Sequence, residues 1–257
     1  MTREPQRHHP SDLLLAAAVD EAISPRIRRL WDERVAQEKV FVGRQGIFSS
    51  RLHRFGYQLA FRSPEACLDA ACHSTPTPSA AWTELQHERA TAHVLRATFG
   101  RADVDQVAQG HWVFVRCPRA YLTGNLPLPS RPDRLIVEVS ENVLVDDEIL
   151  AGVTRLRAAG FRISLPGFVS RADQRRLLPF ADFVKIDVRD LDVEGRPVVE
   201  LGRSTGALLI AEFVETGPML QQSRDLGFDL FQGNLLERGE LLDRSRAALV
   251  PTGGGHV

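Results

Sequence analysis

Short apolar segments alternate with helix-like segments over most of the chain, and this alternation limits the fold more than any other feature does. The predicted strands span residues 113–115, 135–139, 161–165, 183–186, 208–211 and 229–232, and most of them are short and mainly apolar. Continuous apolar runs of this length are typical of strands buried on both faces, and such strands are usually parallel and covered by helices. The intervening segments, such as 146–159 and 218–226, have the apolar spacing of helices. The pattern therefore predicts an α/β protein.

Two further apolar runs, at residues 40–48 and 55–61, come first and are joined by a short polar link. Such a pair predicts an antiparallel hairpin. With these runs the strands number about eight, at which a parallel sheet covered by helices closes into a barrel. An open doubly wound sheet is the alternative, but no strand is followed by the glycine-rich phosphate loop of that architecture. We expect a modified (β/α)8 barrel of the TIM type with an initial antiparallel hairpin.

A segment with two helix signals precedes the predicted barrel. Ser11 is placed to cap a helix over residues 12–23, and Pro25 begins a second helix over 25–35. Apolar residues recur at every fourth position and form a stripe of Leu15, Val19, Ile23, Ile27, Trp31 and Val35. We expect an N-terminal tail and helical arm at 1–39, the barrel at 40–245 and a flexible tail at 246–257. The stripe either packs on the barrel or contacts another protein, and the sequence leaves both open.

Charge and cysteine content limit the partners and the compartment. The formal net charge of −1 gives no general attraction to DNA or to an anionic membrane. The apolar run at residues 13–19 is far shorter than the ~20 residues of a membrane span. The cysteines Cys67, Cys72 and Cys117 are odd in number and lack the spacing of a metal site. We expect a cytoplasmic protein with reduced thiols that binds neither DNA nor membranes.

Polar residues concentrate where the predicted strands end. In a parallel barrel these ends meet at one face, which carries the functional side chains. Glu138, Lys185 and Glu212 each lie within an otherwise apolar strand, where a charge is costly unless it is paired or faces a polar cavity. Pro166 and Gly167 follow the strand at 161–165, and their side chains supply neither a metal ligand nor a proton. The sequence predicts a polar pocket with one strand end that carries no reactive group.

A set of segments resembles one known family. The segments read GYQLAFR, FVRCPRAYL, VEVSE, FRISLPGF, FVKID, AEFVET and LGFDLFQGNLL, in the order and spacing of the EAL-type cyclic-di-GMP phosphodiesterase domain. The resemblance covers roughly residues 40–240. The stretches GRQGIF and ERATAHVLRATF resemble most the EAL-like half of bacterial proteins that join an EAL domain to an HDOD domain, here without the HDOD portion.

The resemblance implies a site at the barrel mouth where carboxylates hold two divalent metals, which activate water against a phosphodiester. Positions that keep the family's residue are Glu138, Lys185, Glu212, Glu215 and Gln232. The family's nucleotide-contacting glutamine and arginine correspond to Gln45 and Arg62.

Other positions of the implied site are changed. The glutamate that gives the family its name corresponds to Gln58, and the asparagine ligand on the next strand corresponds to Arg116. The aspartate pair that bridges the metals corresponds to Pro166 and Gly167. An arginine stays protonated and repels a metal, so we expect Arg116 to pair with Glu138 or Glu212 instead.

These changes predict a degenerate EAL domain with no catalytic residues, no bound metal and no cofactor. We expect a signalling regulator that acts through protein–protein interaction, with a partner that the sequence does not identify and with a homodimer left open. One alternative is a receptor that binds cyclic-di-GMP without hydrolysing it, through Gln45, Arg62 and Arg116. A second alternative is residual phosphodiesterase activity at an altered site.

Overall fold

A computed structural model describes residues 41–62, 83–100, 104–189 and 191–243. These residues belong to the unit Val40–Val257, and no residue of the preceding unit Met1–Lys39 is among them. The predicted helical arm and the predicted tail at 246–257 therefore lie outside the described residues. None of the described helices is long and apolar enough to cross a membrane.

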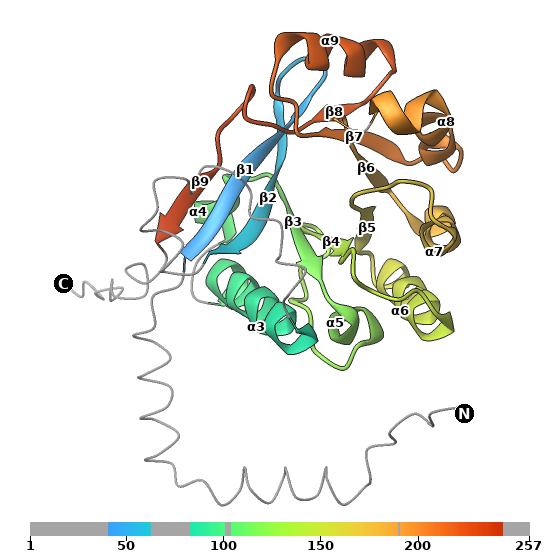
Figure 1. The fold of residues 1–257 in the computed structure, drawn as a ribbon. Coiled ribbons are helices and arrows are strands. Elements are labelled where there is room, and N and C mark those ends of the chain that lie inside the picture. Colours follow the sequence, from blue (N-terminus) through green and yellow to red (C-terminus); the bar gives the residue numbers. More distant parts are fainter. Residues whose placement is uncertain (1–40, 63–82, 101–103, 190, 244–257) are drawn as a thin grey trace, which may run out of the picture. The chain divides into compact units, whose positions relative to one another are not determined.

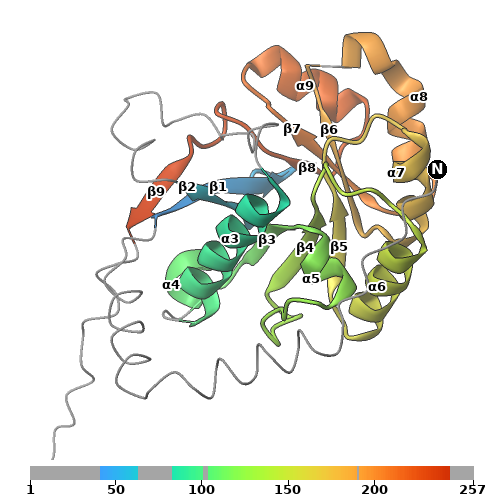
Figure 2. The same ribbon diagram turned by 60° about the horizontal axis from the view of Figure 1, so that its bottom comes forward.

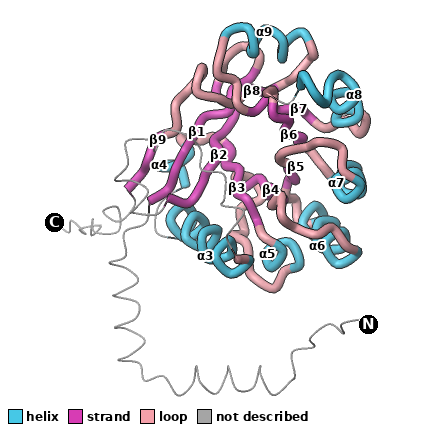
Figure 3. Tube along the Cα trace, in the orientation of Figure 1, coloured by secondary structure: helices cyan, strands magenta, loops and turns pink. Residues whose placement is uncertain are grey.

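The described strands form a closed barrel. In chain order they are β1 (Phe41–Ser49), β2 (Arg54–Arg62), β3 (Trp112–Cys117), β4 (Leu135–Val139), β5 (Arg162–Leu165), β6 (Phe183–Asp187), β7 (Leu208–Glu212), β8 (Leu230–Phe231) and β9 (Glu240–Asp243). Strands β2 to β8 are parallel neighbours, and β1 closes the ring because it pairs antiparallel with both β2 and β8. Figure 3 shows the strands as an inner ring with helices outside. The predicted hairpin and (β/α)8 barrel are both confirmed.

Helices cover the outer face of the parallel strands (Figures 1 and 2). They are α3 (Glu84–Leu95), α4 (Val104–Ala108), α5 (Arg119–Thr123), α6 (Asp147–Ala158), α7 (Ala172–Leu177), α8 (Leu191–Arg203) and α9 (Gly217–Asp225), with a π-helical turn at Arg96–Gly100 and a 3-10 turn at Leu178–Phe180. Local sequence explains where several begin. For example, the Asp146 side chain accepts a hydrogen bond from Ile149 N at 3.0 Å and so caps α6.

Three short elements were not predicted from the sequence. Helices α4 and α5 each have five residues, too few to show a helical period. Strand β9 pairs with the first residues of β1, and Leu242 lies opposite Val42. Helix α8 runs from Leu191 across a kink at Gly195, whose φ is 66°.

The interior of the barrel contains two layers of side chains. The lower layer, near the strand starts, consists of the buried apolar residues Ile47, Phe114, Ile136, Phe183, Ile210 and Leu230. A register shift in the hairpin leaves Phe55 unpaired, and its ring packs against this layer, 5.6 Å from the ring of Phe183. The upper layer, near the strand ends, is polar and forms the floor of the mouth.

Candidate functional site at the barrel mouth

Seven polar residues from seven segments meet in the upper layer. They are Gln45 of β1, Gln58 of β2, Arg116 of β3, Glu138 of β4, Lys185 of β6, Glu212 of β7 and Gln232, which directly follows β8. All are buried except Arg116, whose side chain is 27% exposed. Strand register explains the convergence, because Arg116 lies opposite Glu138 and because inward positions recur at every second residue. The polar residues predicted at the strand ends therefore converge, and they form a buried layer of contacting side chains.

Lys185 lies at the centre of this layer and is fully buried. Its Nζ lies 2.6 Å from Gln58 Oε1, 2.9 Å from Glu138 Oε2, 3.2 Å from Glu212 Oε1 and 3.4 Å from Gln232 Oε1. An ammonium group has three protons to donate, so these four oxygens saturate it. The ring of Phe114, with its centroid 5.3 Å from Nζ, lies on the side of the lower layer.

Gln58 fits this arrangement through both ends of its amide group. Its oxygen accepts from Lys185, and its Nε2 donates to Glu138 Oε1 at 3.3 Å and to Phe114 O at 3.4 Å. A carboxylate at this position would lack the two donated bonds and would face the negative charge of Glu138. The amide is thus matched to a mouth whose central cation is a lysine.

Arg116 pairs with Glu138, as predicted from the sequence. Its Nε lies 3.0 Å from Glu138 Oε1, and its Nη2 lies 3.2 Å from Glu141 Oε1. The other predicted partner, Glu212, is bound by Lys185 instead. Glu138 therefore receives hydrogen bonds or ion pairs from three side chains, and Arg116 closes the layer toward solvent.

The two buried carboxylates of the layer differ in acidity. Burial would raise the pKa of Glu138, but the cations of Lys185 and Arg116 outweigh burial and hold that pKa below its usual value. Burial also acts first on Glu212, where Lys185 opposes it only in part and Glu138 adds to it, so the pKa of Glu212 is raised. The contrast follows from contacts, since Glu138 has two cations beside it and Glu212 has one.

A chain of amides joins the layer to the segment after β8. Gln232 Nε2 donates to Gln45 Oε1 at 2.9 Å, and Gln45 Nε2 donates to Glu237 O at 3.1 Å. Glu237 in turn accepts two hydrogen bonds from Arg54 and one from Gly46 N. Sequence reasoning placed Gln45 and Gln232 at the mouth but missed Glu237, which joins the hairpin to the segment between β8 and β9.

Two predicted site residues lie apart from this layer. Glu215 is exposed on the connection between β7 and α9, and no hydrogen bond or ion pair joins it to the seven residues. Arg62 ends β2 opposite Phe41, four positions beyond Gln58 and hence about 13 Å along the strand. The predicted nucleotide-contacting set of Gln45, Arg62 and Arg116 is therefore spread along the mouth.

Pro166 and Gly167 stand directly after β5, where the sequence placed them. Gly167 has a φ of 52°, and a Cβ there would lie 3.3 Å from Glu141 Oε1. Gln174 of α7 donates to Gly167 O at 2.8 Å and accepts from Val169 N at 3.0 Å, which fixes the turn. Neither residue brings an oxygen ligand toward the layer from its side chain.

The residues at the mouth do not fit the two metals that the sequence resemblance implies. Such ions need several anionic oxygens that converge on one point. Here Glu138 is held by Lys185 and Arg116, and Glu212 is held by Lys185.

The rim beside this layer holds a feature that sequence reasoning missed. Phe213 directly follows Glu212 and has a φ of 59°, a conformation costly for an aromatic residue. The Arg189 guanidinium lies 3.8 Å from the centroid of the Phe213 ring and pairs with Asp187 at 2.7 Å. The contacts of Arg189 account for the position of the ring.

Comparison with known proteins gives consistent matches. The model of the family described as "EAL domain" matches residues 121–238. The uncharacterized protein YuxH of Bacillus subtilis is 25% identical over 201 residues, which cover 76% of this chain and 46% of that protein. The cyclic di-GMP phosphodiesterase CdgJ of Vibrio cholerae is 26% identical over 205 residues, which cover 79% of this chain and 45% of that protein. The chain thus spans less than half the length of these relatives.

A solved structure with a similar fold is that of Klebsiella pneumoniae BlrP1 in complex with calcium and cyclic-di-GMP. The TM-score is 0.60 at 21% sequence identity, with 80% of this chain and 57% of that chain covered. At this identity the likeness establishes the fold alone.

Proposed function

From the EAL domain that the family model matches over residues 121–238, we propose that this chain is a bacterial signalling regulator. It has no phosphodiesterase activity and acts by binding another protein. The observation that carries the proposal is the position of Lys185, whose Nζ is saturated by oxygens of Gln58, Glu138, Glu212 and Gln232. Acceptors that would bind metals are thereby committed to side-chain cations.

The charge balance supports the loss of hydrolysis. Glu138 and Glu212 face Lys185 and Arg116, so the buried layer is close to neutral without any ion. Insertion of two divalent cations would require Arg116 to leave Glu138 and would place positive charge beside a buried lysine. Gln58, Pro166 and Gly167 add no anionic oxygen to offset that cost.

The same balance argues against a cyclic-di-GMP receptor. A phosphodiester needs donors that are free to turn toward it, but Arg116 is already held by Glu138 and Glu141. Gln45 is likewise engaged by Gln232 and by the backbone of Glu237. CdgJ and BlrP1 are described with this nucleotide, so its binding to this chain is the alternative that experiment must decide.

The expected compartment belongs to the same proposal. Cys117 is buried and carries a free thiol, which suits a reducing cytoplasm. Burial raises the pKa of this thiol, so it remains protonated and inert.

The test is to restore the implied site and compare it with the natural chain. We expect no Mn²⁺ binding by calorimetry and no hydrolysis of cyclic-di-GMP for the natural protein. We expect Mn²⁺ binding to appear when Gln58→Glu, Arg116→Asn, Pro166→Asp and Gly167→Asp are combined, because the carboxylates then outnumber the cations. The matched control adds Glu138→Ala to the restored protein and should abolish the gained binding.

Metal-dependent hydrolysis by the natural protein that disappears with Glu138→Ala would disprove the proposal. Tight metal-free binding of cyclic-di-GMP that disappears with Arg116→Ala would instead establish the receptor. Both measurements use the full chain, with its folding checked by circular dichroism.

A further inference from the structure

We propose that the amino-terminal end of the barrel, opposite the mouth, binds the protein partner, and that it takes a segment with acidic side chains around an apolar one. The inference rests on the proposed function only in naming a protein as the partner. The residues of the proposed surface belong to the starts of β2, β3, β5 and β7 and to the turn between β1 and β2. None of them contacts the polar layer of the mouth in the hydrogen bonds or ion pairs described above.

Apolar side chains reach the surface at this end. Phe55 and Trp112 pack against the lower layer from below, and both are partly exposed. Leu208, at the start of β7, lies opposite Phe183 in register and is 40% exposed. Single exposed apolar residues are ordinary, but several at the same end of a barrel are typical of a contact surface.

The turn between β1 and β2 adds a strained residue to the same end. Leu52 has a φ of 60° and is 48% exposed. The turn is held by Arg224 of α9, whose Nη2 donates to Ser50 O at 3.2 Å, and by Leu52 N, which donates to Ser49 O at 2.8 Å. A leucine is strained in the left-handed region, and such strain is often retained at binding sites.

Basic side chains that have no ion pair among the described residues lie at the same end. The Arg162 guanidinium lies 4.7 Å from the centroid of Trp112, and it forms no ion pair within the described residues. Arg51 and His53 are exposed in the turn and likewise have no ion pair among the described residues. The nearby Arg54, Arg134 and Arg157 are instead committed to Glu237, Asp105 and Asp182. The free basic groups therefore complement an acidic segment.

Other occupants fit less well. A second copy would place this basic surface against itself across a two-fold axis, with like charges opposed. Nucleic acid would use the cations but would leave Leu52 and Leu208 without apolar contacts. A protein segment with one apolar anchor and flanking carboxylates satisfies both features.

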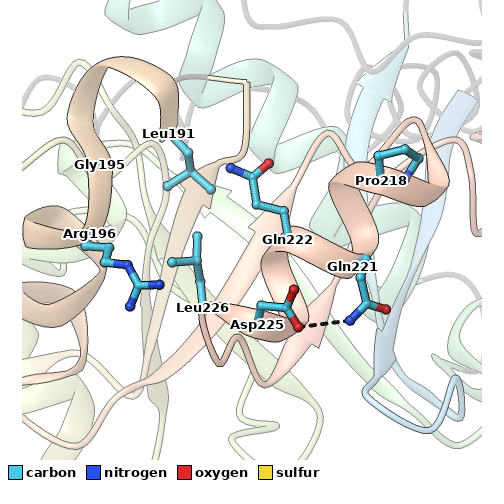
Figure 4. A pocket seen from close by; sticks show the side chains of 8 residues that line it. All are labelled: Leu191, Gly195, Arg196, Pro218, Gln221, Gln222, Asp225 and Leu226. Carbon is cyan, nitrogen blue, oxygen red and sulfur yellow. Dashed lines mark hydrogen bonds between the residues drawn. The ribbon is translucent and has the colours of Figure 1, made fainter.

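The cavity between α8 and α9 is a competing surface and carries no comparable argument. It has a volume of about 610 Å³ and is lined by Leu191, Gly195, Arg196, Pro218, Gln221, Gln222, Asp225 and Leu226 (Figure 4). Arg196 and Asp225 bring both signs of charge to its edge, so no charged partner is favoured. Arg196 is exposed, and it serves as a control position.

The experiment is a selection of random displayed peptides of about twelve residues against the full chain, followed by fluorescence titration of a synthetic consensus peptide. Trp31→Phe and Trp82→Phe leave Trp112 as the sole tryptophan, so the signal comes from the proposed surface. We expect a consensus with Asp or Glu on both sides of Leu, Phe or Trp. Arg162→Glu and Leu208→Asp should each weaken binding about tenfold or more, because a central contact is worth at least 1.4 kcal/mol.

Matched controls lie elsewhere on the unit. Arg196→Glu reverses an exposed arginine beside α9, and Leu144→Asp alters a leucine that is 76% exposed near the mouth. Both should change the affinity less than about twofold, since neither touches the proposed surface. Arg162→Glu and Leu208→Asp lie on exposed strand starts, and thermal melts verify that they fold.

Several results would overturn the inference. They are a failure to enrich peptides, a consensus without acidic residues, and a consensus whose affinity is unaffected by Arg162→Glu. Association into dimers that Arg162→Glu abolishes would identify a second copy as the occupant, and flotation with vesicles rich in anionic lipid would identify a membrane. Hydrolysis of cyclic-di-GMP at the mouth would contradict the proposed function and leave the peptide result intact, so the two failures are distinguishable.

Discussion

The two layers inside the barrel are filled in opposite ways. In the lower layer, six apolar residues and the ring of Phe55 fill the space without directional bonds. In the upper layer, each side chain is oriented by a partner, and Lys185 alone touches four oxygens. Apolar packing loses stability in proportion to the volume removed, whereas a buried polar layer is stable only when every member is satisfied. The upper layer is thus the more sensitive to single substitutions.

Removal of the central cation should have the largest effect. Lys185→Met keeps the length of the side chain but leaves the two buried carboxylates, Glu138 and Glu212, without their shared partner. We expect a loss of about 3–5 kcal/mol in the free energy of unfolding, because an uncompensated buried charge remains. Urea unfolding monitored by circular dichroism measures it.

The control for this substitution removes the whole set of charges. Lys185→Met combined with Glu138→Gln and Glu212→Gln should recover much of the lost stability, since neutral groups need no counter-charge. Equal stabilities of the single and triple variants would show that the packing of the lysine stem, and not charge, dominates the upper layer.

A substitution in the lower layer should cost less, because it leaves the ion pairs of the upper layer in place. Phe114 has ring contacts with Phe183 at 5.3 Å and with Phe55 at 6.3 Å between centroids. Phe114→Leu should lower the free energy of unfolding by about 1–3 kcal/mol, since two aromatic contacts and some volume are lost. The loss should be the same at low and high salt. Ile136→Val, in the same layer without ring contacts, is the control, and an equal or larger loss there would contradict the aromatic account.

A smaller effect is expected where the mouth meets the turn after β5. Gly167 has a φ of 52° and would place a Cβ 3.3 Å from Glu141 Oε1. Gly167→Ala should cost about 1 kcal/mol, because an L residue is strained in this conformation. Gly217→Ala is the matched control, since that glycine has open space around its Cβ position. Thermal melts that rank the two variants in the reverse order would contradict the prediction.

The sequence alone predicts the barrel well because most of its strands are short, mainly apolar runs. The segments at 135–139 and 183–186 match β4 and β6 to within one residue. Strand β9 was missed because Leu241 and Leu242 are only two apolar residues between charged ones, and their strand character comes from pairing with β1. Helices α4 and α5 are one turn long and likewise depend on tertiary contacts.

The sequence predicts which residues lie at the site better than it predicts which of their side chains contact one another. Charge alone indicated that Arg116 pairs with Glu138 or Glu212, and the structure selects Glu138, which lies opposite Arg116 on the neighbouring strand. The bond between Lys185 and Gln58 joins residues 127 positions apart across the barrel, and no local pattern indicates it. Glu237 was missed because nothing in its local sequence indicates the long-range contacts with Arg54 and Gly46 that hold it.

The smallest effect should come from Glu212, and it separates the two carboxylates of the upper layer. The pKa of Glu212 is raised by burial, so its stabilising contribution is largest below the unfolded value of about 4.3 and is lost as the pH rises through the folded pKa. Glu212→Gln should therefore change the free energy of unfolding by less than about 1 kcal/mol at pH 7. Relative to the natural protein, the variant should gain stability from pH 4 to pH 8.

The pKa of Glu138 is lowered by Lys185 and Arg116, so Glu138→Gln should show the reverse trend, with a deficit at pH 7 that shrinks as the pH falls below about 4. Urea unfolding of both variants across this range measures the trends, and parallel curves would show that the two carboxylates share one environment.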